Sequence, residues 1–267
     1  MNPQISVVLT CHNRKSKTIA CLQSILAQKV DATLSCFLVD DASTDGTAEA
    51  VSKLWPTACI IRGTGNLFWC GGMRVAWKQA SSEDPDYYFL VNDDTVLLTD
   101  ALQELLSLVP DPQSSRIGVG AICDPRTNQW TYGGLQSNHP FPRFPPSPRL
   151  CRTLNMNAAL VPRSVFQRLG VLHRAYRHAM GDMDYGLRAT EQGIEILETT
   201  TFIGQCPTNS PKGTWRDKTL GRAIRFKKVL HPKGLPPVDW FVYTRRNCGI
   251  HWLQYFFSPY FRILFKK

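Results

Sequence analysis

Residues 89–96 read Phe-Leu-Val-Asn-Asp-Asp-Thr-Val, and in this stretch an apolar run ends in two adjacent carboxylates, Asp93 and Asp94. The run from Tyr87 to Val91 has no polar interruption, which predicts a strand buried on both faces, as in a parallel sheet covered by helices. In open α/β sheets, ligands bind outside the carboxyl ends of the strands. We therefore expect Asp93 and Asp94 to lie at a ligand-binding edge of a sheet.

Two adjacent carboxylates repel each other unless a cation or a hydrogen-bond donor lies between them. A hard divalent ion suits this position, because such ions bind one or two carboxylates and take further ligands from substrate phosphates. Alternatively, Asp93 or Asp94 caps a helix predicted over 97–108, since the first turn of a helix favours acidic residues. The pair by itself leaves both interpretations open.

Strand and helix patterns alternate on both sides of this stretch. Strands are predicted over 5–10, 34–39, 59–62, 117–122 and 156–163, and helices over 17–28, 47–54, 73–80, 101–108 and 164–169. This alternation predicts an α/β fold with a parallel sheet and right-handed crossovers. Residues 124–150 are rich in Pro, Gly and Asn, which predicts a long loop that is functional or disordered.

The composition fits one large domain, or one and a half, in a reduced compartment. The chain has 267 residues and nine cysteines, and no two of these are spaced as a CxxC pair. Most of the cysteines lie in apolar runs, so we expect a cytosolic protein without disulfides or a zinc site. The strand pattern at 5–10 begins almost at the first residue, which leaves no room for a signal peptide.

Charge is distributed unevenly along the chain. Residues 1–139 hold 10 Lys and Arg against 14 Asp and Glu, whereas residues 140–267 hold 21 against 7, a balance of +14. A basic half indicates nucleic acid, an anionic membrane or an anionic substrate as the partner. Because no helix-turn-helix, zinc finger or aromatic RNA-binding signature accompanies it, nucleic acid is not expected.

Two further loops carry carboxylates after predicted strands or before a helix. Asp40 and Asp41 follow the second strand and are candidates for a base or ribose contact, whereas Asp45 is the candidate helix cap. Asp182 and Asp184 open a helix that is predicted to end near residue 193. Since two carboxylates exceed what capping needs, Asp182, expected just outside the helix, is the candidate for facing a ligand. The glycine-rich 63–72 loop matches neither a P-loop nor a dinucleotide fingerprint.

Taken in order, these motifs resemble the family 2 glycosyltransferases of the GT-A fold, and most closely their bacterial rhamnosyltransferase-like members. The matching stretches are 6–14, 39–47, 65–72, 90–94 and 181–188. The resemblance implies a Rossmann-like, mostly parallel sheet flanked by helices over residues 1–205, with a nucleotide-sugar half (1–123) and an acceptor half (124–205). The sequence departs from the family pattern at Cys11-His12, where Thr-Tyr is commoner, and at Asp93, where Asn is frequent.

The resemblance also implies a role for individual residues. Asp40 and Asp41 would bind the nucleotide, Asp94 would hold a divalent metal (Mg²⁺ or Mn²⁺), and Asp182 would be the catalytic base. The other donor-side candidates are Thr10, His12, Asn13, Arg14, Asn66, Gly71, Gly72, Asn92 and Asp93, and the acceptor-side candidates are Asn157, Asp184 and Arg188.

The activity implied is inverting, metal-dependent transfer of a sugar from a UDP-, dTDP- or GDP-linked donor. The acceptor would be a hydroxyl of a glycan or of a polyprenyl-diphosphate-linked molecule in cell-surface polysaccharide synthesis. Two alternatives stay open. A sugar-nucleotide nucleotidyltransferase would need a glycine- and basic-rich signature near the N-terminus, which residues 10–14 match poorly. A non-catalytic protein that binds nucleotides and lipid carriers would bind without turnover.

Residues 206–267 form a basic and aromatic extension in which the resemblance thins. None of its apolar runs reaches the ~18 residues that a membrane-spanning helix needs. Mixed aromatic and basic residues predict a helix in the membrane interface, and therefore a peripheral protein on the cytoplasmic face of the cell membrane. The alternative is a C-terminal helix that packs on the core and exposes a basic face.

Overall fold

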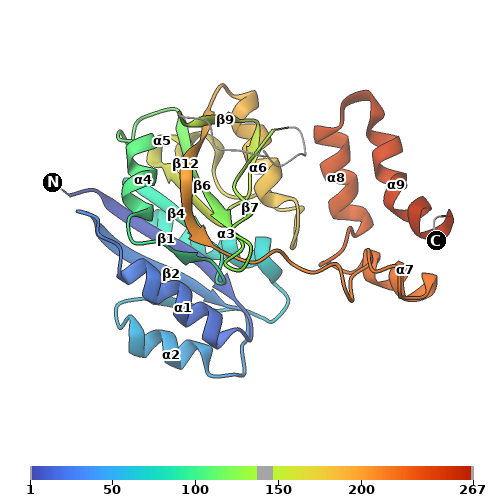
Figure 1. The fold of residues 1–267 in the computed structure, drawn as a ribbon, viewed down its shortest axis with the longest axis horizontal. Coiled ribbons are helices and arrows are strands. Elements are labelled where there is room, and N and C mark those ends of the chain that lie inside the picture. Colours follow the sequence, from blue (N-terminus) through green and yellow to red (C-terminus); the bar gives the residue numbers. More distant parts are fainter. Residues whose placement is uncertain (1, 137–146, 266–267) are drawn as a thin grey trace.

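The computed structural model of the chain describes residues 2–136 and 147–265, so part of the predicted 124–150 loop lies outside the described residues. A ten-stranded sheet runs through the described chain, with helices on both faces (Figure 1). Its main path, in spatial order, is β3 (Cys59–Arg62), β2 (Thr33–Asp40), β1 (Gln4–Cys11), β4 (Tyr87–Val91), β11 (Ala158–Pro162), β6 (Arg116–Cys123), β12 (Glu195–Gln205) and β5 (Val96–Leu97).

The sheet is mostly parallel in its first half, as the sequence predicts. Strand β1 pairs in parallel with β2 and with β4, and β2 pairs in parallel with β3. Strand β11 runs antiparallel between β4 and β6, and β6 pairs in parallel with β12. The carboxyl ends of β1, β2 and β4 therefore meet at one edge of the sheet.

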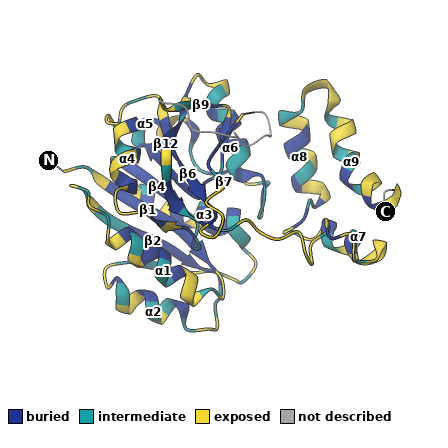
Figure 2. Cartoon of the chain, viewed as in Figure 1, coloured by how far each residue is buried: buried dark blue, intermediate teal, exposed yellow. Residues whose placement is uncertain are grey.

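Alternate residues of the central strands fill two separate cores, which is why these strands read as continuous apolar runs. On one face, Ile5 and Phe89 pack in a hydrophobic cluster with residues of α1 (Lys15–Leu26), α2 (Thr47–Leu54) and α4 (Ala101–Leu108). On the other face, Val8 and Leu90 pack with α3 (Phe68–Ala80), α5 (Arg163–Leu169) and α6 (Gly181–Glu191). The buried residues are concentrated in the sheet between these helices (Figure 2).

Three sequence predictions need correction. Helix α3 begins at Phe68, five residues earlier than expected, and the segment predicted as a helix over 97–108 holds the short strand β5 before α4. The predicted loop at 124–150 contains β7 (Trp130–Tyr132), β8 (Gly134–Leu135) and the start of β9 (Arg149–Cys151). Strand β7 pairs with β6, β9 pairs with β12, and β8 pairs with β10 (Thr153–Leu154) in a second sheet.

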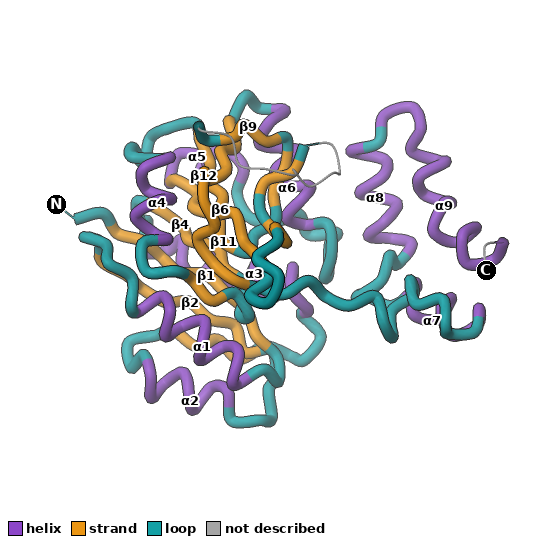
Figure 3. The backbone as a smooth tube through the Cα atoms, in the orientation of Figure 1, coloured by secondary structure: helices purple, strands orange, loops and turns teal. Residues whose placement is uncertain are grey.

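The C-terminal extension is helical and lies to one side of the sheet, beyond α6 (Figure 1). A long loop leads from β12 to α7 (Arg222–Leu230), which is followed by the antiparallel pair α8 (Pro237–Asn247) and α9 (Trp252–Phe265) (Figure 3). Tyr243 of α8 is buried in the core cluster, and Trp240 stacks on it with ring centroids 5.6 Å apart. None of the helices described over 2–136 and 147–265 is long and apolar enough to cross a membrane.

Candidate active site

A cavity of about 290 Å³ opens at the carboxyl ends of β1, β2 and β4. We call it the donor cavity, and its lining residues are Thr10, Cys11, His12, Arg14, Asp41, Gly65, Phe68, Trp69, Asp93, His178, His231 and Lys233. A larger hollow of about 810 Å³ lies at the opposite edge, around Gln4 and Arg163. There Arg163 already pairs with Asp84 and Asp86, so the donor cavity is the better candidate for the active site.

Arg14 explains how Asp93 and Asp94 lie side by side. Its guanidinium is 3.0 Å from Asp93 Oδ1 and also donates to Asp94 Oδ2, and Lys17 Nζ lies 3.7 Å from the same Asp94 oxygen. Burial raises the pKa of Asp93 to about 6, although the neighbouring Arg14 lowers it. The cation that we expected between the two carboxylates is thus supplied, in this structure, by the protein itself.

The carboxylate pair still offers oxygen atoms to a metal ion. Asp93 Oδ2 is buried and has no hydrogen-bond partner. Within residues 2–136 and 147–265, no group of three or more His, Cys, Asp or Glu side chains is placed to hold a metal. Two carboxylates alone fit Mg²⁺ or Mn²⁺, which bind few protein ligands and complete the shell with phosphate oxygens and water. Arg14 would then have to give up its contact with Asp94.

Asp41 and Asp40 organise the loops around the donor cavity. Asp41 is buried, and its carboxylate accepts backbone N–H groups from Gly65 at 2.7 Å, Leu67 at 3.0 Å and Phe68 at 3.1 Å. These bonds hold the glycine-rich loop and the first residues of α3. Asp40 accepts the Ser43 N–H at 2.8 Å and does not line the cavity. The nucleotide contact predicted for these two residues stays a prediction.

The other donor-side candidates divide into residues that line the cavity and residues that support it. His12 lines it, and its Nδ1 lies 2.6 Å from the Asp41 carbonyl oxygen, so this nitrogen carries the proton and donates. Thr10 also lines it, directly beneath Gly72, where a Cβ would lie 2.1 Å from Thr10 Oγ1. The supporting residues, which are not in the lining, are Asn13, Asn66, Gly71, Gly72, Asn92 and Asp94.

Asp182 is the second residue of α6, so the expectation that it lies just outside the helix is wrong. The N-cap position is Met180, which makes no side-chain capping bond. Asp182 accepts the Met183 N–H at 2.9 Å and the Asn155 side-chain amide at 3.2 Å, and burial raises its pKa. Burial and the charge of Asp182 raise the pKa of Cys70 of α3, which neighbours the cavity residue Trp69, but Asp182 is not in the lining itself.

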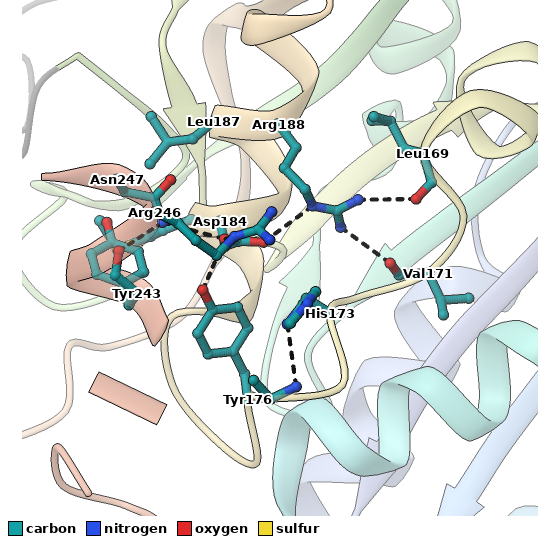
Figure 4. A network of polar contacts seen from close by, with 12 residues as sticks. Leu169, Val171, His173, Tyr176, Asp184, Leu187, Arg188, Tyr243, Arg246 and Asn247 are labelled. Carbon is teal, nitrogen blue, oxygen red and sulfur yellow. Dashed lines mark hydrogen bonds and ion pairs between the residues drawn. The ribbon is translucent and has the colours of Figure 1, made fainter. Parts of the chain in front are cut away.

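Asp184 and Arg188 hold helices together in this structure, and the contact with the acceptor predicted for them stays a prediction. Asp184 is fully buried and accepts from Tyr176 Oη at 2.8 Å, Arg188 Nε at 3.1 Å and Arg246 Nε at 3.2 Å (Figure 4). Arg188 donates its other N–H groups to the carbonyl oxygens of Leu169 and Val171. This network ties α6 to α8.

Asn157, the third acceptor-side candidate, is also internal. It is only 3% exposed, and its side-chain amide donates to Thr95 Oγ1 at 3.2 Å. Its carbonyl oxygen accepts the N–H of Asn92, the residue that precedes the carboxylate pair. Asn157, which directly precedes β11, therefore supports the end of β4, and its predicted contact with the acceptor stays a prediction.

The structure adds cavity residues that the sequence motifs did not indicate. His178 is half-buried, its buried Nδ1 has no hydrogen-bond partner, and burial together with the nearby charge of Lys233 lowers its pKa to about 4. Phe68 packs edge-on against His178 and against His231, with ring centroids 6.3 and 5.8 Å apart. His178 stands close to the Gly181 motif in sequence, whereas His231 and Lys233 were assigned only to the basic extension.

Comparison with solved structures gives the fold class. The mannosyltransferase PcManGT from Pyrobaculum calidifontis, in complex with GDP-Man and Mn²⁺, aligns with a TM-score of 0.62 and 14% identity and covers 100% of this chain and 71% of that chain. S. aureus TarS 1–349, in complex with UDP, aligns with a TM-score of 0.57 and 14% identity. The alignment covers 96% of this chain and 72% of that chain. The architecture is that of the GT-A glycosyltransferases.

Sequence comparison gives the family. Residues 6–168 match the family described as Glycosyl transferase family 2, and the chain belongs to that family. It is 24% identical over 216 residues to the O-antigen biosynthesis protein RfbC of Myxococcus xanthus, which covers 74% of this chain but only 17% of that protein. It is 26% identical over 133 residues to an N-acetylglucosaminyltransferase of Bradyrhizobium elkanii. This match covers 48% of this chain and 71% of that protein.

Proposed function

We propose that the protein transfers a sugar from a nucleoside diphosphate donor to a hydroxyl group, with inversion at the anomeric carbon. The observation that carries the proposal is the donor cavity, where Asp41 and Asp93 face the cationic residues Arg14 and Lys233 at the carboxyl ends of three parallel strands. Family membership supports the reaction class. The relatives described as binding GDP-Man and UDP support a nucleotide-sugar donor.

The cavity combines the groups that such a donor needs. Arg14 and Lys233 provide positive charge for a diphosphate, and Phe68 and Trp69 provide apolar surface for a ring. His178 is neutral at physiological pH, because its pKa is lowered to about 4, so it contributes hydrogen-bonding capacity without charge. The donor would be UDP-, dTDP- or GDP-linked.

A divalent ion, Mg²⁺ or Mn²⁺, would be held by Asp94, with Asp93 Oδ2 as a further available oxygen. When bound, it would offset the charge that grows on the leaving diphosphate. On donor binding, Arg14 would turn its guanidinium from the carboxylates to the phosphates. The same positive charge would then be used first to hold the empty site together and later to bind the donor.

Asp182 would act as the base that takes the proton from the acceptor hydroxyl. A single carboxylate base is sufficient for one displacement, in contrast to the two carboxyl groups of a glycoside hydrolase. Burial raises the pKa of Asp182, which makes it a stronger base than an exposed aspartate. Asn155 would orient it, since its amide donates to Asp182 Oδ2.

The acceptor would be a glycan or a polyprenyl-diphosphate-linked molecule in cell-surface polysaccharide synthesis, on the cytoplasmic face of the membrane. The name of the Myxococcus relative, an O-antigen biosynthesis protein, supports this setting. Helix α9 supports a peripheral membrane contact, because Leu253, Phe257 and Phe261 on it are 50%, 44% and 52% exposed. Exposed apolar groups beside basic residues are typical of interfacial helices.

The test is a panel of UDP-, dTDP- and GDP-sugars, incubated with the protein and Mg²⁺ or Mn²⁺, with release of the nucleoside diphosphate as the readout. Slow release in water and faster release with a saccharide acceptor are expected for one donor class. The same panel with Asp182→Asn controls for contaminating hydrolases. Release of inorganic diphosphate from a nucleoside triphosphate and a sugar phosphate, with no turnover of any nucleotide sugar, would contradict the proposal.

A further inference from the structure

A second cavity, of about 620 Å³, adjoins the donor cavity in the C-terminal extension. We call it the α7 cavity, and its lining residues are Gly213, Thr214, Trp215, Ile224, Lys227, Lys228, His231 and Lys233. His231 and Lys233 line both cavities, so the two spaces share a wall. Through Phe68, which packs edge-on against His231, this wall is also joined to the first turn of α3.

Internal hydrogen bonds fix the shape of the α7 cavity. Arg225 is buried and donates to the Trp215 carbonyl oxygen at 3.0 Å, which holds the 213–215 loop against α7. Asp217, also buried, accepts the Gly213 N–H at 2.6 Å. On the other side, a Cβ at Gly234 would lie 2.4 Å from the Lys228 carbonyl oxygen, so the turn after α7 closes tightly on the helix.

The lining is cationic and has no negative counterpart. It includes three lysines and no Asp or Glu. Asp217 is the one acidic residue among residues 206–238, against eight Lys and Arg, and its carboxylate is already bound to Gly213 and Thr219. Within the described chain, Lys227, Lys228 and Lys233 form no ion pair. A ligand of this cavity therefore carries negative charge.

The α7 cavity also has apolar side chains in its lining, and helix α7 packs against α9. Ile224 is 51% exposed, and Trp215 lies beside it in the lining. Phe226 of α7 packs against Tyr260 of α9, with ring centroids 6.3 Å apart. On α9, Phe261 and Phe265 are 52% and 76% exposed. The cationic cavity thus has apolar side chains in its own lining, and α9, which packs on α7 through Phe226, carries further exposed apolar side chains.

We propose that the α7 cavity binds the phosphate of an amphiphilic acceptor, with the lipid chain directed toward α9 and the sugar directed toward the donor cavity across His231 and Lys233. The ligand class is a phosphate or diphosphate joined to an apolar chain. The inference rests on the proposed function for the identity of the ligand as an acceptor. It goes further by assigning Trp215, Lys227 and Lys228 to acceptor recognition.

The experiment measures binding of a defined amphiphile, dodecyl phosphate, by calorimetry below its micellar concentration. UDP and GDP are present throughout, so that the donor cavity is occupied. Wild-type protein is expected to bind dodecyl phosphate more tightly than inorganic phosphate or the uncharged dodecyl maltoside. The double variant Lys227→Ala/Lys228→Ala is expected to bind it about 30-fold more weakly, since each of the two lysines contributes ~1 kcal/mol near an anionic group and about 1.4 kcal/mol corresponds to tenfold in affinity.

Lys218→Ala is the matched control, because Lys218 is exposed in the same segment and does not line the cavity. It is expected to bind like the wild type. Equal binding by wild type and the double variant overturns the proposal. Inorganic phosphate binding as tightly as dodecyl phosphate overturns it in favour of a free-phosphate site. Loss of anionic-vesicle binding in the double variant, with dodecyl phosphate binding intact, assigns the lysines to the bilayer surface and also overturns it.

Binding of UDP or GDP, measured on separate samples of the same proteins without amphiphile, separates the two proposals. Nucleotide binding together with unchanged amphiphile binding in the double variant defeats the α7 cavity assignment and leaves the transferase function standing. No nucleotide binding by any variant defeats the transferase function, and with it the identity of the amphiphile as an acceptor. An unchanged thermal midpoint of the double variant shows that its loss of binding is local, since neither lysine makes an ion pair in the described chain.

Discussion

The carboxylate of Asp182 accepts one backbone and one side-chain hydrogen bond, and it is not required as a helix cap. Asp182→Asn is therefore expected to keep the fold and donor binding but to lower transfer by about 10²–10⁴-fold, the usual contribution of a general base. The measurement is the rate of nucleoside diphosphate release with acceptor, beside nucleotide affinity and thermal midpoint.

Glu191→Gln is the matched control, since Glu191 is an exposed carboxylate at the other end of α6. Asp184→Asn is unsuitable, because Asp184 is buried in an ion network and its substitution changes stability. A lower thermal midpoint together with undiminished transfer in Asp182→Asn would contradict the catalytic assignment.

Asp94 is expected to control the response to metal. Asp94→Asn is nearly isosteric, so we expect a folded protein whose donor turnover no longer rises with added Mg²⁺ or Mn²⁺. Asp93→Asn should reduce the response of turnover to metal less than Asp94→Asn does, because the family frequently has Asn at that position. The measurement is turnover against metal concentration for the two variants and the wild type. A full metal response in Asp94→Asn would remove this residue from the mechanism.

The burial of Asp93 predicts that the free energy of unfolding depends on pH. Its folded pKa is raised to about 6, above the value of 3.8 for an exposed aspartate. Between these values the folded state keeps a proton that the unfolded state has released, so this group lowers the free energy of unfolding as pH rises from about 4 to 6. Urea unfolding should show that Asp93→Asn gains stability relative to wild type across this range, on the order of 2 kcal/mol. If the free energies of unfolding of Asp93→Asn and wild type differed equally at pH 4 and pH 7, the raised pKa of Asp93 would be contradicted.

Sequence reasoning found the residues that follow strands, and it failed where burial decides the role. Asp93 and Asp94 could be placed at the sheet edge because a continuous apolar strand leads into them. Asp182 and Asp184 look alike in the sequence, and the structure separates them by burying Asp184 completely. His231 could not be found, because its place in the donor cavity depends on a contact with Phe68, more than 160 positions earlier.

At the scale of helices, two buried carboxylates fasten α8 to the rest of the chain. Asp184 of α6 accepts from Arg246 and from Asn247 of α8. Asp239 of α8, only 1% exposed, accepts from the backbone N–H of Arg177 at 2.9 Å, and its carboxylate pairs with the Arg177 side chain. Each contact joins α8 to the segment that contains His178 and Asp182, so α8 supports the candidate active site.

Asp184→Asn is expected to weaken this support. Removing one partner of a buried ion pair costs about 3–5 kcal/mol. We expect a loss of stability at the lower end of this range, because the Arg188 and Arg246 side chains are 16% and 39% exposed and can be hydrated. Urea unfolding measures the loss, and amide exchange in α8 should show faster local opening than in α1. Glu191→Gln, on the exposed face of the same helix, should change stability by less than about 0.5 kcal/mol. Equal stability of the two variants would contradict the role assigned to Asp184.

The short elements were the ones that could not be predicted. Strands β1, β2 and β4 are apolar over most of their length, and that pattern is sufficient to predict them as buried strands. Strand β7 has only three residues and depends on Thr131, whose hydroxyl contacts the carbonyl oxygens of Ile122 and Cys206. The early start of α3 depends on Asp41, which binds the N–H groups of Leu67 and Phe68 from another loop.

At the scale of the whole molecule, the extension both joins the core and exposes apolar surface. Tyr243 is buried in the core cluster, whereas Phe257 and Phe261 remain 44% and 52% exposed. The packing interpretation therefore describes α8, whereas the interfacial interpretation stays a prediction for α9. The boundary predicted at residue 205 stays a prediction, and His231 contributes to the donor cavity from beyond it.

The membrane prediction is tested best by substitution, because ending the chain near Pro237 would also remove the buried residues Asp239 and Tyr243. Phe257→Ser/Phe261→Ser is expected to reduce co-sedimentation with anionic vesicles, since both side chains leave water when the helix enters the interface. Binding by the wild type should fall in part with salt, because surface charges are screened within about 10 Å at 0.1 M.

Leu26→Ser is the control, as Leu26 is 43% exposed on α1, away from the extension. Neutral vesicles in parallel separate the aromatic contribution from the electrostatic one. Equal partitioning of the double variant and the wild type, or no partitioning by either, would assign α9 to packing or to a protein partner.

The order in which the walls of the donor cavity are synthesised follows from their positions in the chain. Ribosomes add about 5–20 residues per second, so the acidic edge at Asp93 and Asp94 leaves the ribosome on the order of ten seconds before His231 and Lys233. Arg14 lies 79 and 80 positions before the two carboxylates, so their counter-charge already exists when they emerge. The charges that balance the first strands are therefore synthesised together, well before the last wall of the cavity is translated.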